Sequence, residues 1–498
     1  MAEKATTASG HGSFSPIQLA GLVGGAIGLI AIMLLPLPQG LPAAGLAMMG
    51  IMLFAVVIWM TEAVPYAVSA AVIIALIALL LGMGPDLANP KVVMGTSKAL
   101  GMALSGFSNT AFALVAGAMF ISAAMMITHL DKRIALLVLS RVGGKTSHIL
   151  AGVIFVGFIL SFFVPSTTAR VSCIVPIVLG IIAAFKVDMK SRFAAMLMIA
   201  TAQADSLWNV GIKTAAAQNM IAVGFIEKQL GVNVSWLEWF IAAAPFSAIM
   251  SVVLFYVLLK TIPPEVKEIE GGHETIAREL KEMGPMTSAQ WRLLIISCVL
   301  LFFWATEKQV HNFDTSTTTL TAIALMLMPG IGVMSWKEAQ ARIGWGTVVL
   351  FGVGISLGQC LLTTKAASWM AGYVGAAFGL QTMTALAIIA VLALFLIIIH
   401  LGFASATGLS AAMIPIVIAV LQSVKTPGIN VIGITIICQY VISFGFILPV
   451  NAPQNMIAYS TETFTPKDFV RTGIPLTICA YALILLLSAT YWRWLGWV

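Results

Sequence analysis

Charged residues are scarce in this sequence: only 9% of its 498 residues are Asp, Glu, Lys or Arg, whereas 60% are hydrophobic. Soluble globular proteins contain about 25% charged residues, so the composition excludes a soluble enzyme. No run of five or more Lys and Arg residues occurs, and the net charge of +7 is spread over many short segments. We therefore expect a polytopic membrane protein with no nucleic-acid partner.

Cysteine is also scarce, and all five residues lie within apolar stretches. Their odd number and their spacing fit neither a disulfide framework nor a zinc site, so we predict no metal site and no cofactor. The His-Glu-x-x-His motif is absent, and no Gly-x-Ser-x-Gly motif has a partner histidine. These absences argue against an intramembrane enzyme. An ion channel is a second rival class, which currents above carrier rates would reveal.

Long apolar runs make up most of the chain. A membrane-spanning helix needs about 20 mostly apolar residues. Two stretches, 147–185 and 382–424, are longer and are each interrupted near the middle by small polar residues. Each is either two complete spans or a re-entrant hairpin with its polar tip at membrane depth. Eleven other runs have the length of a single span: 17–36, 43–62, 65–84, 106–128, 192–211, 237–260, 290–306, 316–334, 345–363, 429–449 and 472–495.

The distribution of Lys and Arg favours the hairpins, because cytoplasmic loops of membrane proteins are enriched in these residues. With a cytoplasmic N-terminus, eleven spans and two re-entrant hairpins, seventeen of the 26 basic residues lie inside and seven outside. Arg170 and Lys213 are left at membrane depth. We therefore predict an inner-membrane protein with a tail and first helix over 1–42, a charged cytoplasmic connector over 261–290 and an external C-terminus.

The two halves on either side of the connector resemble each other. Because an odd number of spans separates the matching segments, we predict two inverted repeats, over 43–260 and 291–498. Inverted repeats with broken helices at the bilayer midplane are typical of secondary transporters. Three motifs recur in order: Trp59-Met-Thr-Glu62 as Trp304-Ala-Thr-Glu307, Ser166-Thr-Thr168 as Ser405-Ala-Thr407, and Gln218-Asn-Met-Ile-Ala222 as Gln454-Asn-Met-Ile-Ala458.

Four polar interruptions lie at membrane depth: the two hairpin tips and one break in each half after them. A helix that restarts there exposes backbone N–H groups, which bind carboxylate or phosphate readily. The alternative is structural, since Ser and Thr in membrane helices often bond to their own helix or to a neighbour. The candidate substrate-binding residues are Ser166, Thr167, Thr168, Arg170, Lys213, Thr214, Asn219, Ser405, Ala406, Thr407, Asn451, Pro453, Gln454 and Asn455.

The two buried cations give the sharper signals, because a charge at the bilayer centre is costly and usually has a function. Arg170 has no acidic neighbour in its own segment. Lys213 either attracts an anion or pairs with Asp205, which precedes it by about two helical turns. Asp205 could alternatively carry a coupling proton. We interpret His400, beside the second tip, as a packed polar residue.

These motifs resemble those of the divalent-anion:sodium symporter family of di- and tricarboxylate transporters. Trp59-Met-Thr-Glu-Ala-Val-Pro65 is similar to the WMTEA-[IV]-P motif of that family, and both hairpin tips fall where the family has paired Ser-Asn-Thr motifs. Pro449-Val-Asn-Ala-Pro-Gln-Asn455 is similar to the segment that usually ends in Pro-Pro-Asn. The resemblance implies an all-helical homodimer of elevator type, with a carboxylate anion held between the two tips.

The sequence also departs from the family pattern. Both tip asparagines are missing, since Thr167 and Ala406 stand in their places. Fixed cations at Arg170 and Lys213 would repel Na⁺ and could instead offset the charge of the substrate. Val-Pro-Ser-Thr-Thr-Ala-Arg170 is also more similar to the exchanger branch of the family, with its citrate/succinate, tartrate/succinate and plastid oxoglutarate/malate antiporters. We therefore predict sodium-independent exchange, with a sodium-coupled dicarboxylate or sulfate symporter as the alternative.

Overall fold

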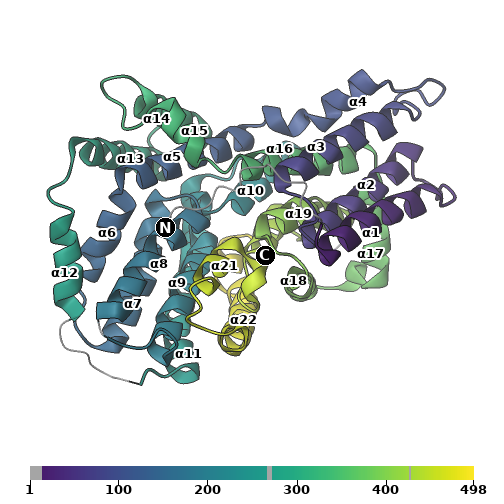
Figure 1. Ribbon diagram of the computed structural model, residues 1–498. Coiled ribbons are helices and arrows are strands. Elements are labelled where there is room, and N and C mark those ends of the chain that lie inside the picture. The colour runs from purple at the N-terminus through teal and green to yellow at the C-terminus, as the bar shows by residue number, and fades with distance from the viewer. Residues whose placement is uncertain (1–13, 185, 266–271, 425–427) are drawn as a thin grey trace.

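The computed structural model describes residues 14–184, 186–265, 272–424 and 428–498, and the chain is helical throughout (Figure 1). Residues 1–13 of the predicted tail and 266–271 of the predicted connector lie outside these residues. Ten described helices are long and apolar enough to cross a membrane, and four apolar helices are shorter. The described residues form only two isolated β-bridges and no strand. The all-helical membrane fold is thus confirmed.

The chain begins with α1 (Pro16–Met33), which packs against α2 and is otherwise largely exposed. The first half then runs through α2 (Ala43–Met60), α3 (Tyr66–Leu76) and its π-helical continuation η1 (Ile77–Leu81), α4 (Thr96–Ala103), η2 (Ser105–Ser108), α5 (Thr110–Thr128), α6 (Leu130–Leu139), α7 (Thr146–Phe163), α8 (Thr167–Ala184), α9 (Arg192–Gly211), η3 (Lys213–Ala215), α10 (Ala217–Leu230) and α11 (Trp236–Thr261).

The connector contains α12 (Gly272–Glu282), and the second half then repeats the order of the first. The second half ends with the short helix α23 (Tyr491–Trp494). Its elements are α13 (Ser288–Thr306), α14 (Thr315–Leu327), α15 (Trp336–Arg342), α16 (Trp345–Thr363), α17 (Ala366–Ala377), η4 (Leu380–Thr382), α18 (Ala385–His400), α19 (Ala406–Ser423), α20 (Val431–Ile442), η5 (Pro449–Asn451), α21 (Pro453–Tyr459) and α22 (Pro466–Ala489).

Local structure repeats between the halves as well as element order. Trp59 Nε1 donates to Ser69 Oγ and ties α2 to α3, while Trp304 Nε1 donates to Thr319 Oγ1 and ties α13 to α14, both at 3.2 Å. The backbone is extended on each side of η3 and again on each side of η5. The recurring Trp-x-Thr-Glu motif therefore has a structural role in both halves, because each tryptophan links its own helix to the next long helix.

Contacts between the halves are reciprocal. Helix α10 packs against α19, and its counterpart α21 packs against α8. Gln454 Nε2 donates to Ser206 Oγ at 3.1 Å, and Gln218 Nε2 reaches Ser443 Oγ at 3.5 Å. These contacts place the break of each half against the other half.

Each predicted hairpin is a pair of helices joined by a short non-helical tip. Pro165 ends α7, because the residue before a proline is pushed out of the helical region, and Val164 is indeed extended. In the second hairpin the backbone of Ser405 is extended, and its hydroxyl accepts a bond from Gly408 N, so α19 starts there. Pro176 and Pro415 lie at equivalent positions inside α8 and α19.

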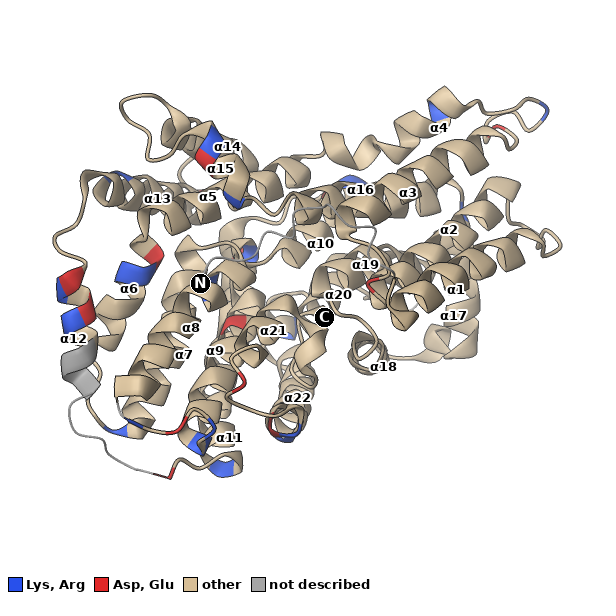
Figure 2. Ribbon diagram, viewed as in Figure 1, with Lys and Arg blue, Asp and Glu red and all other residues tan. Residues whose placement is uncertain are grey.

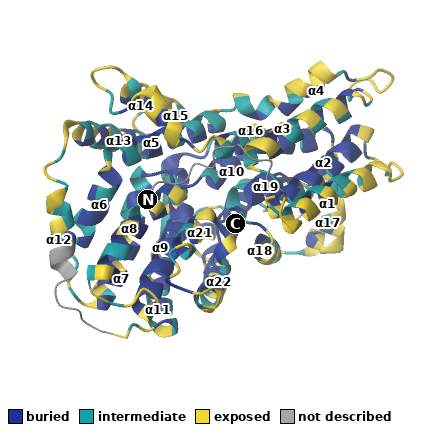
Figure 3. Ribbon diagram, in the orientation of Figure 1, coloured by how far each residue is buried: buried dark blue, intermediate teal, exposed yellow. Residues whose placement is uncertain are grey.

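Burial is deepest in the middle of the molecule, where Figure 3 shows α9 almost entirely dark blue, and most of α10 is buried as well. Charged residues gather instead on α12 and at helix ends, as the blue and red segments of Figure 2 show. Three of the buried charged residues lie near the helix breaks, in α8, α9 and η3: Arg170, Asp205 and Lys213. The predicted connector is held at its end by Arg133 of α6, which donates to the carbonyl oxygens of Met283, Gly284 and Pro285.

Gly473 permits a close approach between α22 and the segment that follows α20. A Cβ atom there would overlap the carbonyl oxygen of Phe446 and lie 2.9 Å from Ile447 Cα, both backbone atoms that cannot rotate away. We expect Gly473→Ala to lower the thermal unfolding temperature in detergent, with an overpacking cost of about 1–3 kcal/mol. Gly24→Ala is the matched control, since that Cβ would meet nothing within 4 Å. An unchanged unfolding temperature for Gly473→Ala would contradict this close packing.

Candidate functional site

A cavity of about 510 Å³ lies where the two hairpin tips meet. Its volume is typical of small-molecule sites, which span roughly 300–1,000 Å³. The cavity brings both tips together with the polar breaks that follow α9 and α20. Eight of the residues that the sequence predicts line it: Ser166, Thr167, Thr168, Ser405, Ala406, Thr407, Pro453 and Gln454.

Two groups of residues make up most of the lining. The first, here called the paired floor, consists of equivalent residues from both halves: Ser166 with Ser405, Thr167 with Ala406, Thr168 with Thr407, Ala217 with Pro453, and Gln218 with Gln454. The second part, here called the mouth, comes from α3, α5, α15 and the start of α16. The mouth residues are Tyr66, Met119, Ser122, Met126, Arg342, Gly344, Thr347 and Leu350.

Two threonine hydroxyls of the paired floor are free to bind a ligand. Ser166 Oγ accepts a bond from Ala169 N, and Ser405 Oγ accepts one from Gly408 N. Within the described chain, no hydrogen bond engages the hydroxyl of Thr168 or Thr407. Both threonines lie in the first turn of a helix of 18 residues, where backbone N–H groups carry partial positive charge. The paired floor can therefore offer each end of an anion one hydroxyl and one helix N-terminus.

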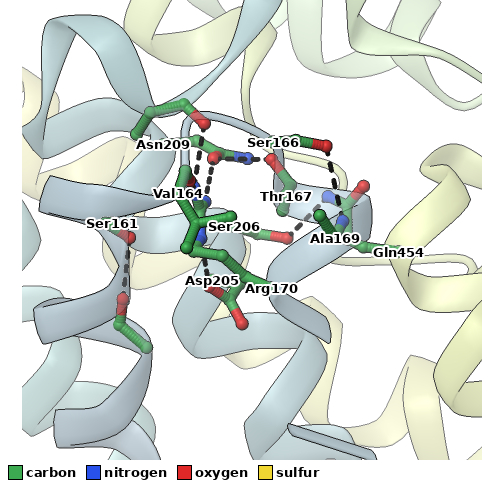
Figure 4. Close-up of polar contacts among 12 residues, drawn as sticks. Ser161, Val164, Ser166, Thr167, Ala169, Arg170, Asp205, Ser206, Asn209 and Gln454 are labelled. Atoms are coloured by element: carbon green, nitrogen blue, oxygen red, sulfur yellow. Dashed lines mark hydrogen bonds and ion pairs between the residues drawn. The ribbon is translucent and has the colours of Figure 1, made fainter. Parts of the chain in front are cut away.

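Arg170 lies beside the first tip and does not line the cavity (Figure 4). Its side chain is fully buried, and Nε lies 2.6 Å from Asp205 Oδ1. Nη1 donates to the carbonyl oxygens of Val164 and Ala215 at 2.6 and 2.9 Å, and Nη2 donates to Asn209 Oδ1 at 2.7 Å. Thr167 Oγ1 donates to the same oxygen of Asn209. The guanidinium therefore supports the first tip on the side away from the cavity.

Three predicted asparagines are likewise bound to backbone carbonyl groups. Asn219 Nδ2 donates to the carbonyl oxygens around the first break, and Asn455 Nδ2 donates to that of Gly445 at the equivalent position. Asn451 Nδ2 donates to the carbonyl oxygens of His400, Leu401 and Phe403 in the second tip. None of the three asparagines lines the cavity. Asn219 and Asn455 therefore stabilise the two breaks internally, and Asn451 connects the second break to the second tip.

Lys213 is buried away from the cavity. Its Nζ donates to the carbonyl oxygen of Val234 at 2.6 Å, and Thr214 Oγ1 accepts a bond from Trp236 Nε1. The pairing of Lys213 with Asp205, one of the two alternatives considered from the sequence, is wrong, because Asp205 pairs with Arg170. His400 is a packed polar residue, as predicted: its Nε2 lies 3.3 Å from the carbonyl oxygen of Asn451, and its side chain is buried.

Several lining residues are missing from the sequence prediction. Asn209 and Gln218 lie inside the predicted polar break, and the recurrence of Gln218 as Gln454 was a usable signal for the glutamine. The mouth residues come from helices in which the sequence shows no polar break and no recurring motif at those positions. Among them, Arg342 is the only charged side chain in the lining described here.

The amino-acid sequence matches a family model over residues 18–498, and that family is described as the sodium:sulfate symporter transmembrane region. A protein of Cupriavidus necator, described as a membrane protein, is 54% identical over 96% of this chain and 93% of its own length. A citrate/succinate antiporter of Escherichia coli is 26% identical, with 91% and 94% covered. The sodium-dependent dicarboxylate transporter SdcS of Staphylococcus saprophyticus is 24% identical, with 95% and 91% covered.

The fold is similar to that of solved transporter structures. The crystal structure of the Alcanivorax borkumensis YdaH transporter superposes with a TM-score of 0.56 at 13% sequence identity, covering 86% of this chain and 97% of that one. The Neisseria gonorrhoeae MtrF structure gives a TM-score of 0.52 at 12% identity, covering 92% and 97%. At these identities the likeness concerns the fold alone.

Proposed function

This chain belongs to the sodium:sulfate symporter family, and on that premise we propose that it is a secondary transporter that exchanges one di- or tricarboxylate for another. A 26%-identical relative is a citrate/succinate antiporter, and another, 27% identical, is an L-tartrate/succinate antiporter. The observation that carries the proposal is the paired floor. Its two equivalent tips present the free hydroxyls of Thr168 and Thr407 and two helix N-termini to one cavity. An anion with a carboxylate at each end matches that arrangement.

Sodium independence is the finer part of the proposal. Transporters of this general type hold Na⁺ on carbonyl groups of unwound backbone. Here the carbonyl oxygens of Val164 and Ala215 already accept bonds from the buried Arg170. Those of Leu401 and Phe403 accept bonds from Asn451. Each of these carbonyl oxygens already has one donor, which makes it a weaker ligand for Na⁺, so we infer that Arg170 positions the first tip without a bound ion.

The alternative function is a sodium-coupled dicarboxylate or sulfate symporter of the same fold. The family description and the relationship to SdcS favour it. In either case we propose a homodimer in a bacterial inner membrane, with the N-terminus in the cytoplasm and the C-terminus outside. We also propose that 43–260 and 291–498 are inverted repeats and that the hairpins move as in an elevator. The repeated element order and the reciprocal contacts of the glutamines support the repeats.

Uptake of labelled succinate into proteoliposomes tests the proposal. The lumen is preloaded with unlabelled dicarboxylate or left empty, each with and without a sodium gradient. We expect uptake only into preloaded vesicles and no response to sodium, because exchange requires a counter-substrate and Arg170, rather than a bound ion, positions the first tip. Uptake into empty vesicles that requires sodium would establish the symporter and refute the role given to Arg170. Vesicles without the protein serve as the control.

A further inference from the structure

Arg342 lines the cavity at the C-terminal end of α15, and its side chain is exposed. In the part of the chain that the structure describes, no hydrogen bond or ion pair engages its guanidinium. The one acidic residue on the same short helix is Glu338, whose carboxylate instead accepts bonds from the backbone N and the hydroxyl of Ser335. The cavity therefore has a single unneutralised charge in its described lining, and that charge is positive.

This cation has no unpaired counterpart in the other half of the chain. Helix α4 precedes α5 as α15 precedes α16, and the one basic residue of α4 is Lys98. Lys98 pairs with the carboxylate of Asp86, whereas Arg342 has no partner among the described residues. The paired floor is thus built from both halves, whereas an unpaired charge lines the cavity from one half only.

We propose that Arg342 binds the outer carboxylate of the substrate in the conformation described here, in which its exposed side chain lines the cavity, and therefore on one face of the membrane only. The inference rests on the proposed carboxylate transport. A guanidinium pairs with a carboxylate through two parallel hydrogen bonds, which suits a dianion whose inner end is held by the tips. In an inverted-repeat transporter, the opposite opening is built from the equivalent elements of the other half. There α4 takes the place of α15, and its one basic residue, Lys98, is already paired with Asp86, so α4 offers the substrate no unpaired cation.

The expected consequence is an asymmetry in substrate affinity between the two faces of the membrane. We expect Arg342→Gln to raise the KM for succinate about three- to tenfold on the face where the cavity opens as described, which the topology above makes the cytoplasmic face. The KM on the opposite face should not change. The effect should shrink at high salt, because salt screens an exposed charge. Lys337→Gln is the matched control: it removes the same charge from an exposed residue of α15 that does not line the cavity.

Right-side-out and inverted membrane vesicles containing the full chain, each preloaded with unlabelled dicarboxylate, give the KM on the two faces separately. Arg342→Cys adds a second test, since modification with a cationic thiosulfonate should restore the KM and an anionic one should not. The wild-type chain, treated in parallel, controls for the native cysteines. An equal change on both faces, or no change on either, overturns the role of Arg342. Wild-type vesicles that do not exchange dicarboxylates refute instead the transport function itself.

Discussion

Replacing Arg170 with Gln is expected to abolish transport and also to destabilise the protein. The sequence alone predicts that this variant loses exchange and remains a folded dimer. The structure changes that expectation, because the substitution leaves the carboxylate of Asp205 buried without a partner. Removing one member of a buried ion pair typically costs about 3–5 kcal/mol. The carbonyl groups of Val164 and Ala215 also lose their donor, so the first tip loses its support.

A double variant separates these two effects. Arg170→Met combined with Asp205→Leu removes both charges and fills the space with apolar side chains, which is often nearly neutral for stability. We expect it to recover most of the unfolding temperature in detergent and still to be inactive in the succinate exchange assay. The reason is that the carbonyl groups of Val164 and Ala215 lose the guanidinium in both variants, and Asn209 keeps only the bond from Thr167. An Arg170→Gln protein with the wild-type unfolding temperature and no exchange would instead point to direct contact between Arg170 and the substrate.

The all-helical fold and the positions of the hairpin tips could be predicted from the sequence, because both leave local signals. Long apolar runs mark the spans, and Pro165 and Ser405 mark the ends of helices at the tips. The short helices α4, α15 and α17 were not predicted. They are too short for a membrane span, so counting apolar residues does not find them. One of them, α15, carries the charge at the mouth.

The candidate site was predicted in part, and the difference has a physical cause. Ser166 and Ser405 recur at equivalent positions, and repetition reveals such residues without a structure. The partner of Arg170 could not be predicted in the same way, since Asp205 is 35 residues away on a different helix. A sequence shows that a buried cation exists, but it does not show whether the guanidinium faces the cavity or supports the loop behind it. The roles of Asn219, Asn451 and Asn455 are equally ambiguous in the sequence, because a side-chain amide can bind the substrate or donate hydrogen bonds to backbone carbonyl groups.

Removing both free hydroxyls of the paired floor is expected to abolish transport while leaving the fold intact. In the variant Thr168→Val with Thr407→Val, each valine keeps the shape of threonine and removes only a hydroxyl that has no hydrogen bond within the described chain. A hydrogen bond to a charged group contributes about 1.5–3 kcal/mol. Losing two should therefore lower kcat/KM for succinate exchange by roughly 100-fold or more. Initial exchange rates in proteoliposomes measure the loss.

The equivalence of the two tips makes this prediction sharper than a simple loss of activity. If each threonine binds one end of the anion, the single variants should lose similar amounts, about tenfold or more each. Thr201→Val is the matched control, because that hydroxyl is buried in α9 and donates to the carbonyl oxygen of Leu197 in its own helix. It should exchange normally, and all four variants should keep nearly the wild-type unfolding temperature. A double variant that retains most of its activity would mean that the helix N-termini bind the substrate without the threonines, and a loss confined to one threonine would contradict a substrate held symmetrically between the tips.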